Sequence, residues 1–264
     1  MMHSPIPIAE AGALNSACQG CRSGAPLDIA ITMAFQPIVD VTTGAIFAYE
    51  ALVRGAEGQS AGEVLSSIDP AAIYKFDQAC RVKAIELAGA LFPADTDTKL
   101  SINFKPNAVY EPTACLKASL VAAKRARFDP RRLMFEFTED ERMHDAAHVR
   151  RIVETYRASG FTTAIDDFGA GYAGLKLLAD LQPDLLKLDM ALIRGIEASQ
   201  SRQAIVAAVV RMADALGITC IAEGIETGAE LRAVKALGIR LCQGYFLARP
   251  ATAALPTLCN VGGF

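Results

Sequence analysis

The sequence predicts an α/β protein, and three observations favour a (β/α)8 barrel over other α/β folds. Short apolar segments alternate with longer amphipathic ones along most of the 264 residues, as in a mostly parallel sheet covered by helices. About eight segments resemble strands, the number that such a barrel needs. The alternative, a doubly wound sheet, often carries a phosphate loop. However, no G-x-G-x-x-G follows the first strand and no G-x-x-x-x-G-K-[ST] occurs.

The first two predicted strands flank a turn, and a long helix follows them. Segments 31–39 and 45–52 are rich in β-branched and aromatic residues, and the DVTTG between them fits a hairpin. Segment 71–91 has helical spacing of its apolar residues and stops before Pro93. Later strands are predicted at 99–104, 132–139, 161–168, 185–190, 218–224 and 241–248. Helices are predicted near 113–127, 145–159, 172–181, 198–216 and 227–237.

The chain divides into a short tail and one domain. Residues 1–26 are rich in Gly, Ala, Ser and Pro without a sustained period, so we expect a flexible N-terminal tail. Residues 27–264 are predicted to form a single domain, because the 52% hydrophobic content is ample for one large core. Cys18 and Cys21 could be half of a zinc or redox site. The tail offers only His3 as a further ligand, which favours ordinary thiols.

Composition disfavours several classes of partner and location. The net charge of −3 gives no global indication of binding to a nucleic acid polymer or a membrane surface. No apolar run approaches the ~20 residues of a membrane span, and the N-terminus lacks the pattern of a signal peptide. The seven cysteines are scattered and odd in number, which argues against a disulfide framework and predicts a cytoplasmic location.

Polar side chains recur near the ends of the predicted strands. They are Glu50, Asn103, Glu136, Glu139, Asp166, Asp167, Lys187, Asp189, Glu223 and Gln243. The C-terminal strand ends of a barrel open onto one mouth, so such a set would face a single cavity. For any one acidic residue, capping of the following helix is an equally good explanation. The set as a whole favours a shared site.

The chemistry of this set indicates a divalent cation. Five or more converging carboxylates would repel one another strongly at low dielectric, and a hard cation such as Mg²⁺ or Mn²⁺ suits their oxygens better than zinc does. So many carboxylates could hold two ions ~3.5–4 Å apart, a geometry suited to phosphodiester cleavage by water. Lys187 could then orient that water or neutralise developing charge, and Arg54 could grip a phosphate oxygen.

A series of motifs carries a family resemblance. In chain order they are FQPIVD (35–40), EALVR (50–54), INF (102–104), FEFTE (135–139), DDFGAGY (166–172), KLD (187–189), AEGIET (222–227) and QGY followed by RP (243–250). Together they resemble the EAL family of cyclic di-GMP phosphodiesterases over about residues 30–252. The resemblance implies a TIM-like (β/α)8 barrel whose first strand runs antiparallel to the others. It also implies hydrolysis of cyclic di-GMP to linear pGpG with Mg²⁺ or Mn²⁺.

The resemblance also implies roles for individual residues. The metal ligands would be Glu50, Asn103, Glu136, Asp166, Asp167 and Glu223. Of these, Glu50, Asp167 and Glu223 are expected to act in catalysis with Lys187, which would contact the attacking water. Gln36, Arg54, Asp189, Glu226 and Gln243 are expected to contact the substrate. Glu139 would anchor the loop 168–174.

Every metal-site position that can be mapped carries the expected residue, which favours an active enzyme that lowers cyclic di-GMP and so affects biofilm formation and motility. The alternative is a non-catalytic cyclic di-GMP receptor or protein-interaction module. Departures from the family pattern at Lys105, Ala173, Gly174 and Arg240 keep it open, because they concern loop order and guanine-side contacts. A phosphodiesterase for another substrate is disfavoured by the joint presence of EALVR, DDFGAGY and QGY. A homodimer formed around the 168–174 loop and a regulatory protein partner are also expected.

Overall fold

The first two strands form an antiparallel hairpin. The computed structural model of the chain describes residues 29–105, 112–138, 146–171 and 174–259, and the structural statements below concern these residues. β1 (Ile31–Asp40) and β2 (Ala45–Gly55) pair along their whole length. The Asp40 carboxylate accepts a hydrogen bond from the Thr42 N–H at 3.0 Å, and Gly44 has a φ of +74°. Glycine adopts this left-handed conformation without strain, so the chain reverses where the sequence predicts.

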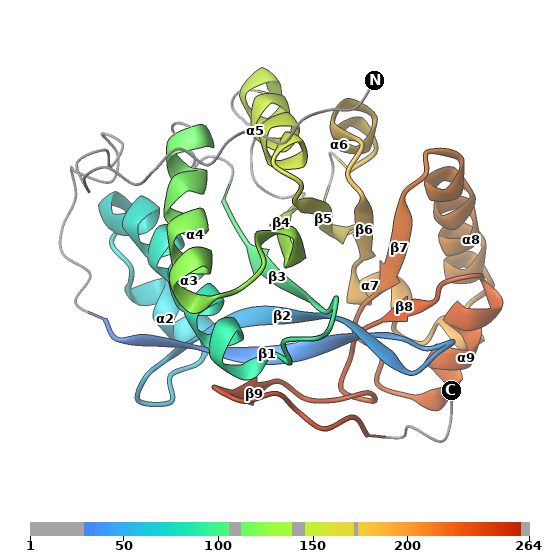
Figure 1. Cartoon of the computed structure of the whole chain (residues 1–264). Helices are drawn as coiled ribbons and strands as arrows, with labels where there is room; N and C mark the ends of the chain where they lie inside the picture. Colours follow the sequence, from blue (N-terminus) through green and yellow to red (C-terminus); the bar gives the residue numbers. More distant parts are fainter. Residues whose placement is uncertain (1–28, 106–111, 139–145, 172–173, 260–264) are drawn as a thin grey trace.

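Six further strands close the sheet into a barrel (Figure 1). They are β3 (Lys99–Asn103), β4 (Leu133–Thr138), β5 (Thr162–Phe168), β6 (Leu185–Leu188), β7 (Thr219–Ala222) and β8 (Leu241–Cys242). From β2 to β8 each strand pairs in parallel with the next. β8 then pairs antiparallel with β1, which closes the barrel. The predicted barrel with an antiparallel first strand is confirmed.

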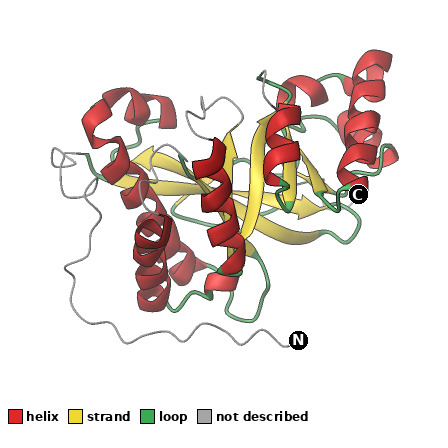
Figure 2. Cartoon of the chain, turned by 90° about the horizontal axis from the view of Figure 1, so that it is seen from above, coloured by secondary structure: helices red, strands yellow, loops and turns green. Residues whose placement is uncertain are grey.

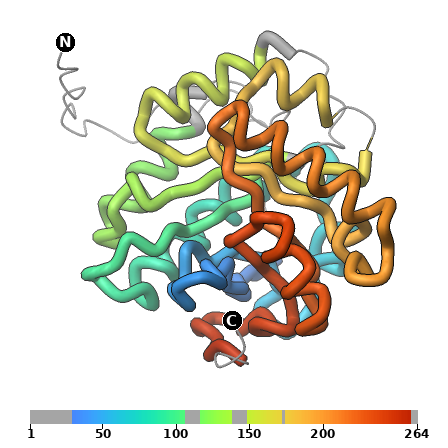
Figure 3. The backbone as a smooth tube through the Cα atoms, turned by 90° about the vertical axis from the view of Figure 1, so that its right-hand side faces the viewer, coloured from blue at the N-terminus to red at the C-terminus, as the bar shows by residue number. Residues whose placement is uncertain are grey.

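Helices surround the strands (Figure 2). They are α2 (Ala61–Ser67), α3 (Ile73–Leu91), α4 (Pro112–Ala126), α5 (Ala146–Ala158), α6 (Gly174–Leu181), α7 (Met190–Ile193), α8 (Gln200–Ala215) and α9 (Gly228–Ala236), with single 3-10 turns at Pro70–Ala72, Pro130–Arg132 and Ile196–Ala198. α8, orange in Figure 3, packs on the outer side of β7. Among the described helices, none is long and apolar enough to cross a membrane.

Several elements differ from the predictions. The single turn α7 was not predicted. α2 was not predicted either. It begins with a capping box in which Ser60 and Glu63 satisfy each other's backbone N–H groups. The short strand β9 (Ala251–Thr252), also not predicted, adds to β1 opposite Ala34 and Phe35. The strand predicted at 241–248 is wrong beyond Cys242. There the chain turns at Gly244, whose backbone lies so close to Ile225 that a Cβ would meet the Ile225 carbonyl oxygen at 2.1 Å.

The apolar core has two layers, which follow from the alternation of side chains along each strand. In β4, Leu133, Phe135 and Phe137 point outward into the large core between the strands and the helices. Met134 points inward and belongs to a small cluster inside the barrel. The members of that inner cluster are Ile38, Ala48, Met134, Ala164, Leu185, Ile221 and Leu241. One inward residue from most strands therefore fills the barrel interior.

Arg240, one of the departures from the family pattern, lies at the N-terminal end of β8. Its guanidinium pairs with the Asp40 carboxylate at the end of β1, at 2.7 Å. Because β1 runs antiparallel, its last residue is at the same end of the barrel as the first residues of the parallel strands. The expectation that Arg240 affects substrate contacts is therefore not supported, since the pair lies at the end opposite the mouth.

Candidate metal centre and active site

The predicted site residues occupy one position on each strand. On the parallel strands, the inward residue two positions after the interior apolar residue is polar, because alternate residues share a face. Thus Ala48 is followed by Glu50, Met134 by Glu136, Ala164 by Asp166, Leu185 by Lys187, Ile221 by Glu223 and Leu241 by Gln243. On antiparallel β1 the order reverses, and Gln36 precedes Ile38 and lies opposite Glu50. A layer of polar side chains therefore lies at the mouth of the barrel, above the inner apolar cluster.

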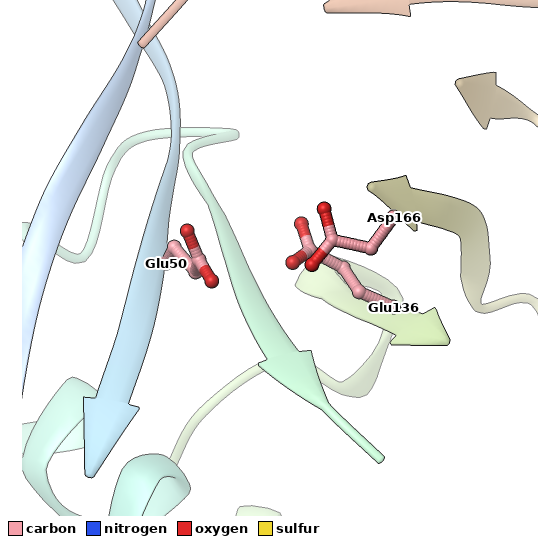
Figure 4. Close-up of side chains that lie close together, drawn as sticks. All are labelled: Glu50, Glu136 and Asp166. Atoms are coloured by element: carbon pink, nitrogen blue, oxygen red, sulfur yellow. The ribbon is translucent and has the colours of Figure 1, made fainter. Parts of the chain in front are cut away.

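Lys187 lies at the centre of this polar layer, with a relative exposure of 1%. Its Nζ is 2.6 Å from Glu223 Oε1, 2.8 Å from Glu136 Oε2 and 2.9 Å from Asp166 Oδ1. Glu50 Oε2 is more distant, at 3.6 Å. One ammonium group thus forms ion pairs with four carboxylates. Figure 4 shows the Glu50, Glu136 and Asp166 carboxyl groups, which reach toward a common space from β2, β4 and β5.

Glu50 is held by two amide side chains, and a third amide, that of Gln36, contacts one of them. Asn103 Nδ2 donates to Glu50 Oε1 at 2.8 Å, and Gln243 Nε2 donates to Glu50 Oε2 at 2.7 Å. Gln243 Nε2 also lies 3.3 Å from Gln36 Oε1, and Gln36 in turn donates to the Ala248 carbonyl at 3.2 Å. Because Asn103 uses its amide nitrogen on Glu50, its carbonyl oxygen is the atom it would offer to a cation.

Asp166 and Asp167 both contribute to the acidic cluster although they are neighbours in a strand. Asp167 has a φ of +54°, and the pairing of β5 with β6 shifts register between Ile165 and Phe168. This left-handed backbone costs a non-glycine residue about 1–2 kcal/mol. It interrupts the alternation of faces. Oxygens of Asp166, Asp167 and Glu223 consequently lie within 4.8 Å of one another, as do those of Glu50, Glu136 and Asp166.

Burial and the concentration of negative charge shift the pKa values of Glu136, Asp167, Glu223 and Lys187. Burial, reinforced by neighbouring carboxylates, raises the pKa of Glu136 to about 8 and that of Asp167 to about 6. Burial also raises the pKa of Glu223 well above its usual value. Burial alone would lower the pKa of Lys187, but the surrounding carboxylates hold it well above its usual value. Lys187 therefore stays an ammonium ion at neutral pH.

Glu50 behaves differently from the other acids. Burial would raise the pKa of Glu50, but Lys187 and the amides of Gln243 and Asn103 hold it below its usual value. When all are ionised, the five carboxylates of the cluster exceed the single ammonium group by four negative charges. Two divalent cations would balance this excess. The residues fit such ions, since Glu136 Oε1 is buried without a hydrogen-bond partner among the described residues and hard oxygens are the donors.

The remaining predicted residues lie around the cluster. Arg54, four residues after Glu50 on β2, donates to the Val53 carbonyl at 2.7 Å, and no ion pair joins it to a carboxylate among the described residues. Glu226 is exposed and pairs with Arg194, so the structure does not bring it into the acidic cluster. Glu139 lies outside the described residues, as do Ala173, Cys18 and Cys21.

Asp189 lies beyond the end of β6, so it does not share a strand face with Lys187. Its Oδ1 accepts a hydrogen bond from the Ala191 N–H at 2.8 Å and so caps α7. This is the helix-capping role that the sequence leaves open for any acidic residue after a strand. Gly174, another departure from the family pattern, is buried at the start of α6.

One ion pair beside the site was not predicted from the sequence. Asp77 and Arg81 on α3 are buried and 2.9 Å apart, and Asp77 Oδ1 accepts a hydrogen bond from the Lys105 N–H at 3.2 Å. Lys105 stands two residues after Asn103, so this pair supports the backbone that follows β3. The signal in the sequence was two charges, four residues apart, on the face of helix 71–91 that also carries Phe76, Ala84 and Ile85.

The fold and the site define a (β/α)8 barrel with an acidic mouth whose carboxylates could hold a cation. A family model described as the EAL domain matches residues 27–250. The chain therefore belongs to the EAL domain family.

Solved structures agree with this assignment. The chain is 50% identical to a standalone versatile EAL protein from Vibrio cholerae O395 bound to cyclic di-GMP, with a TM-score of 0.85, covering 90% of this chain and 99% of that one. It is 36% identical to Klebsiella pneumoniae BlrP1 in complex with manganese and cyclic di-GMP, with a TM-score of 0.80, covering 87% of this chain and 59% of that one.

Curated relatives carry differing names. The chain is 31% identical over 225 residues to the blue light- and temperature-regulated antirepressor BluF of Escherichia coli, covering 85% of this chain and 55% of BluF. It is 30% identical over 239 residues to the cyclic di-GMP phosphodiesterase NbdA of Pseudomonas aeruginosa, covering 84% of this chain and 29% of NbdA. The chain thus spans about half or less of the length of these relatives.

Proposed function

We propose that this chain hydrolyses one phosphodiester bond of cyclic di-GMP to give linear pGpG, using Mg²⁺ or Mn²⁺ at two sites. The observation that carries the proposal is the complete acidic cluster around Lys187. A receptor that only bound the nucleotide would have no need of so costly an accumulation of buried carboxylates. The manganese and cyclic di-GMP bound to BlrP1 and the name of NbdA support the same substrate and the same class of cofactor.

The reaction joins a water oxygen to phosphorus and breaks the bond from phosphorus to the 3′ oxygen, which leaves with a proton. Divalent ions in such a site polarise the phosphate and lower the pKa of water. Glu50, Asn103, Glu136, Asp166, Asp167 and Glu223 are the proposed ligands. Lys187 is a hydrogen-bond donor here, because its raised pKa keeps it charged. It would orient the attacking water and offset the negative charge that develops on the phosphoryl group.

The substrate would be held by residues on β1, β2 and β8. Arg54 presents a planar guanidinium at the mouth, a group suited to paired hydrogen bonds with phosphate oxygens. Gln243 donates hydrogen bonds to both Gln36 and Glu50, so these two amides would couple substrate contact to the metal ligands. Asp189 and Glu226 remain proposed substrate contacts, each with its protein partner described above. We also retain a homodimer, a regulatory partner and a cytoplasmic location as proposals.

A non-catalytic role is the second candidate, and the name of the relative BluF favours it. In that case the acidic cluster would bind a cation and cyclic di-GMP without turnover, and the chain would act by contact with another protein. The two candidates differ in one observable, the formation of pGpG.

The test is incubation of the purified chain with cyclic di-GMP and Mn²⁺ or Mg²⁺, followed by chromatography of the nucleotides. We expect pGpG from the native chain and no detectable pGpG from Glu50→Gln, which keeps the shape of the side chain and removes its charge. Glu154→Gln, on the exposed face of α5, is the matched control and should retain full activity. Calorimetric binding of cyclic di-GMP without pGpG, under conditions where a related enzyme turns over, would refute the enzyme and favour the receptor.

A further inference from the structure

A single helical turn, α7, follows β6 directly after Asp189. Asp189 Oδ1 accepts from the Ala191 N–H at 2.8 Å, and the Asp189 carbonyl accepts from the Leu192 N–H at 3.0 Å. Arg202 Nε on α8 donates to the Ala191 carbonyl at 3.1 Å. Ile193, at the end of the turn, is fully buried. The turn is therefore held from both ends although it is only four residues long.

The first contact of this turn is with the loop after β5. Gly169 has a φ of +100°, and a Cβ built on it would lie 2.5 Å from Leu192 Cδ1. The end of the Leu192 side chain therefore occupies the space beside the Gly169 backbone. The backbone just before Gly169 is held by the residue that caps the same turn, because the Asp189 N–H donates to the Phe168 carbonyl at 3.2 Å. These contacts lie directly after Asp167, whose φ of +54° needs support from its surroundings.

The second contact is with the loop after β7. Gly224 has a φ of +66°, and a Cβ built on it would lie 2.4 Å from the Met190 Cβ. Gly224 directly follows Glu223, whose N–H donates to the Leu188 carbonyl at 3.2 Å. The same turn thus packs against one glycine just after Asp167 and another just after Glu223. The carboxylates that precede these glycines belong to one cluster, Asp166, Asp167 and Glu223.

We propose that α7 supports the cluster of Asp166, Asp167 and Glu223 through the loops that follow these residues. We further propose that Leu192 is a positioning residue for the cation that this cluster binds. Leu192 is apolar, so it offers neither a charge nor a hydrogen bond to the three carboxylates. It acts by restricting the loop that begins at Asp167, so that the Asp167 carboxylate stays beside those of Asp166 and Glu223. The cluster Glu50, Glu136 and Asp166 is held instead by Lys187 and by amide side chains. The inference rests on the proposed metal centre but not on turnover.

The test is calorimetric titration of the full chain with Mn²⁺. Leu192→Ala removes the atoms that fill the space beside Gly169, and we expect the affinity of one Mn²⁺ site to fall by about tenfold, the lower end of the range for residues that orient metal ligands. Leu216→Ala, the same substitution at an exposed position after α8, is the matched control and should stay within about twofold. Leu192→Met keeps a long apolar side chain at the contact and should recover most of the affinity.

Equal Mn²⁺ affinity in Leu192→Ala and the native chain would overturn the proposal, as would an equal loss in Leu192→Ala and Leu216→Ala. Circular dichroism of the metal-free variants establishes that they are folded. If Leu192→Ala does not fold, Leu192→Val is titrated in its place. This variant also lacks Cδ1, and the same outcomes decide the test. Mn²⁺ binding with the expected pattern but no pGpG would refute the proposed activity and leave this inference standing. Formation of pGpG by the native chain, with unchanged Mn²⁺ affinity in Leu192→Ala, would support the proposed activity and overturn this inference.

Discussion

At the scale of single residues, the site depends on one ammonium group among five carboxylates. Lys187 is closer than 3 Å to oxygens of Glu136, Asp166 and Glu223. The barrel interior withdraws all of these groups from water, so their attraction and repulsion are stronger than on a surface. Without Lys187 the acids would be left buried and unpaired. The lysine is therefore expected to matter for stability as well as for catalysis.

Lys187→Met should show this dependence in metal-free protein. Removal of one partner from a buried ion pair typically costs about 3–5 kcal/mol, so we expect a loss of that size in the free energy of unfolding measured with urea and a chelator. Mn²⁺ should restore part of it, because it replaces the missing positive charge. Lys176→Met, at an exposed position on α6, is the control. A loss below about 1 kcal/mol, the range of exposed pairs, would contradict this account of Lys187.

The pair of Asp40 and Arg240 should make a small contribution to stability that depends on pH. Burial would raise the pKa of Asp40, but hydrogen bonds from Thr42 and the charge of Arg240 hold it below its usual value. A carboxyl whose pKa is lower in the folded state stabilises the protein above its unfolded pKa, about 3.9. This contribution is lost as pH falls through the folded value.

Arg240→Ala should therefore lower the free energy of unfolding at pH 7 by less than about 1 kcal/mol, because Arg240 is more than half exposed. The difference from the native chain should be smaller at pH 3, below the unfolded pKa of about 3.9, than at pH 7. Urea unfolding at the two pH values measures it, with Arg211→Ala on the exposed side of α8 as the control. The rate of pGpG formation should not change, since the pair lies at the far end of the barrel. A difference of equal size at the two pH values would show that Arg240 stabilises by packing instead.

At the scale of elements, helices pack on each other as well as on the strands. α3 and α4 approach so closely that a Cβ on Gly89 would lie 2.4 Å from the Ala126 carbonyl oxygen. Gly89→Ala should therefore force the helices apart and cost about 1–3 kcal/mol, as overpacking usually does. Gly62→Ala on α2 meets nothing within 4 Å and should stabilise the protein by up to about 1 kcal/mol, because alanine favours a helix over glycine. Thermal unfolding measures both. Equal stability of the two variants would contradict the close approach.

The elements also show where prediction from sequence succeeds. Long periodic segments such as α3 and α8 were predicted within a few residues, because amphipathic spacing persists over several turns. α7 and β9 are too short to leave a periodic signal. The strand predicted at 241–248 has the composition of a strand, but the close approach of Gly244 to Ile225 ends it at Cys242. That contact joins segments that no local pattern connects.

At the scale of the whole molecule, closure of the barrel converts a repeated local pattern into a site. Most of the parallel strands contribute an apolar residue to the interior and, two positions later, a polar one to the mouth. Because eight strands close, the polar residues meet although they are spread from Gln36 to Gln243. Antiparallel β1 obeys the same geometry in reverse, which places Gln36 opposite Glu50.

The sequence by itself predicted the barrel and the acidic set, since the alternation of strands and helices and the residues at the strand ends are local properties of the chain. The antiparallel first strand was implied by the family resemblance that the motifs carry. The sequence did not determine how the charges are arranged. Only the tertiary structure places the ammonium of Lys187 against four carboxylates, pairs Glu226 with Arg194, turns Asp167 into a left-handed conformation and packs Leu192 beside Gly169. The physical reason is that these features depend on distances between strands and loops, and such distances are set when the barrel closes.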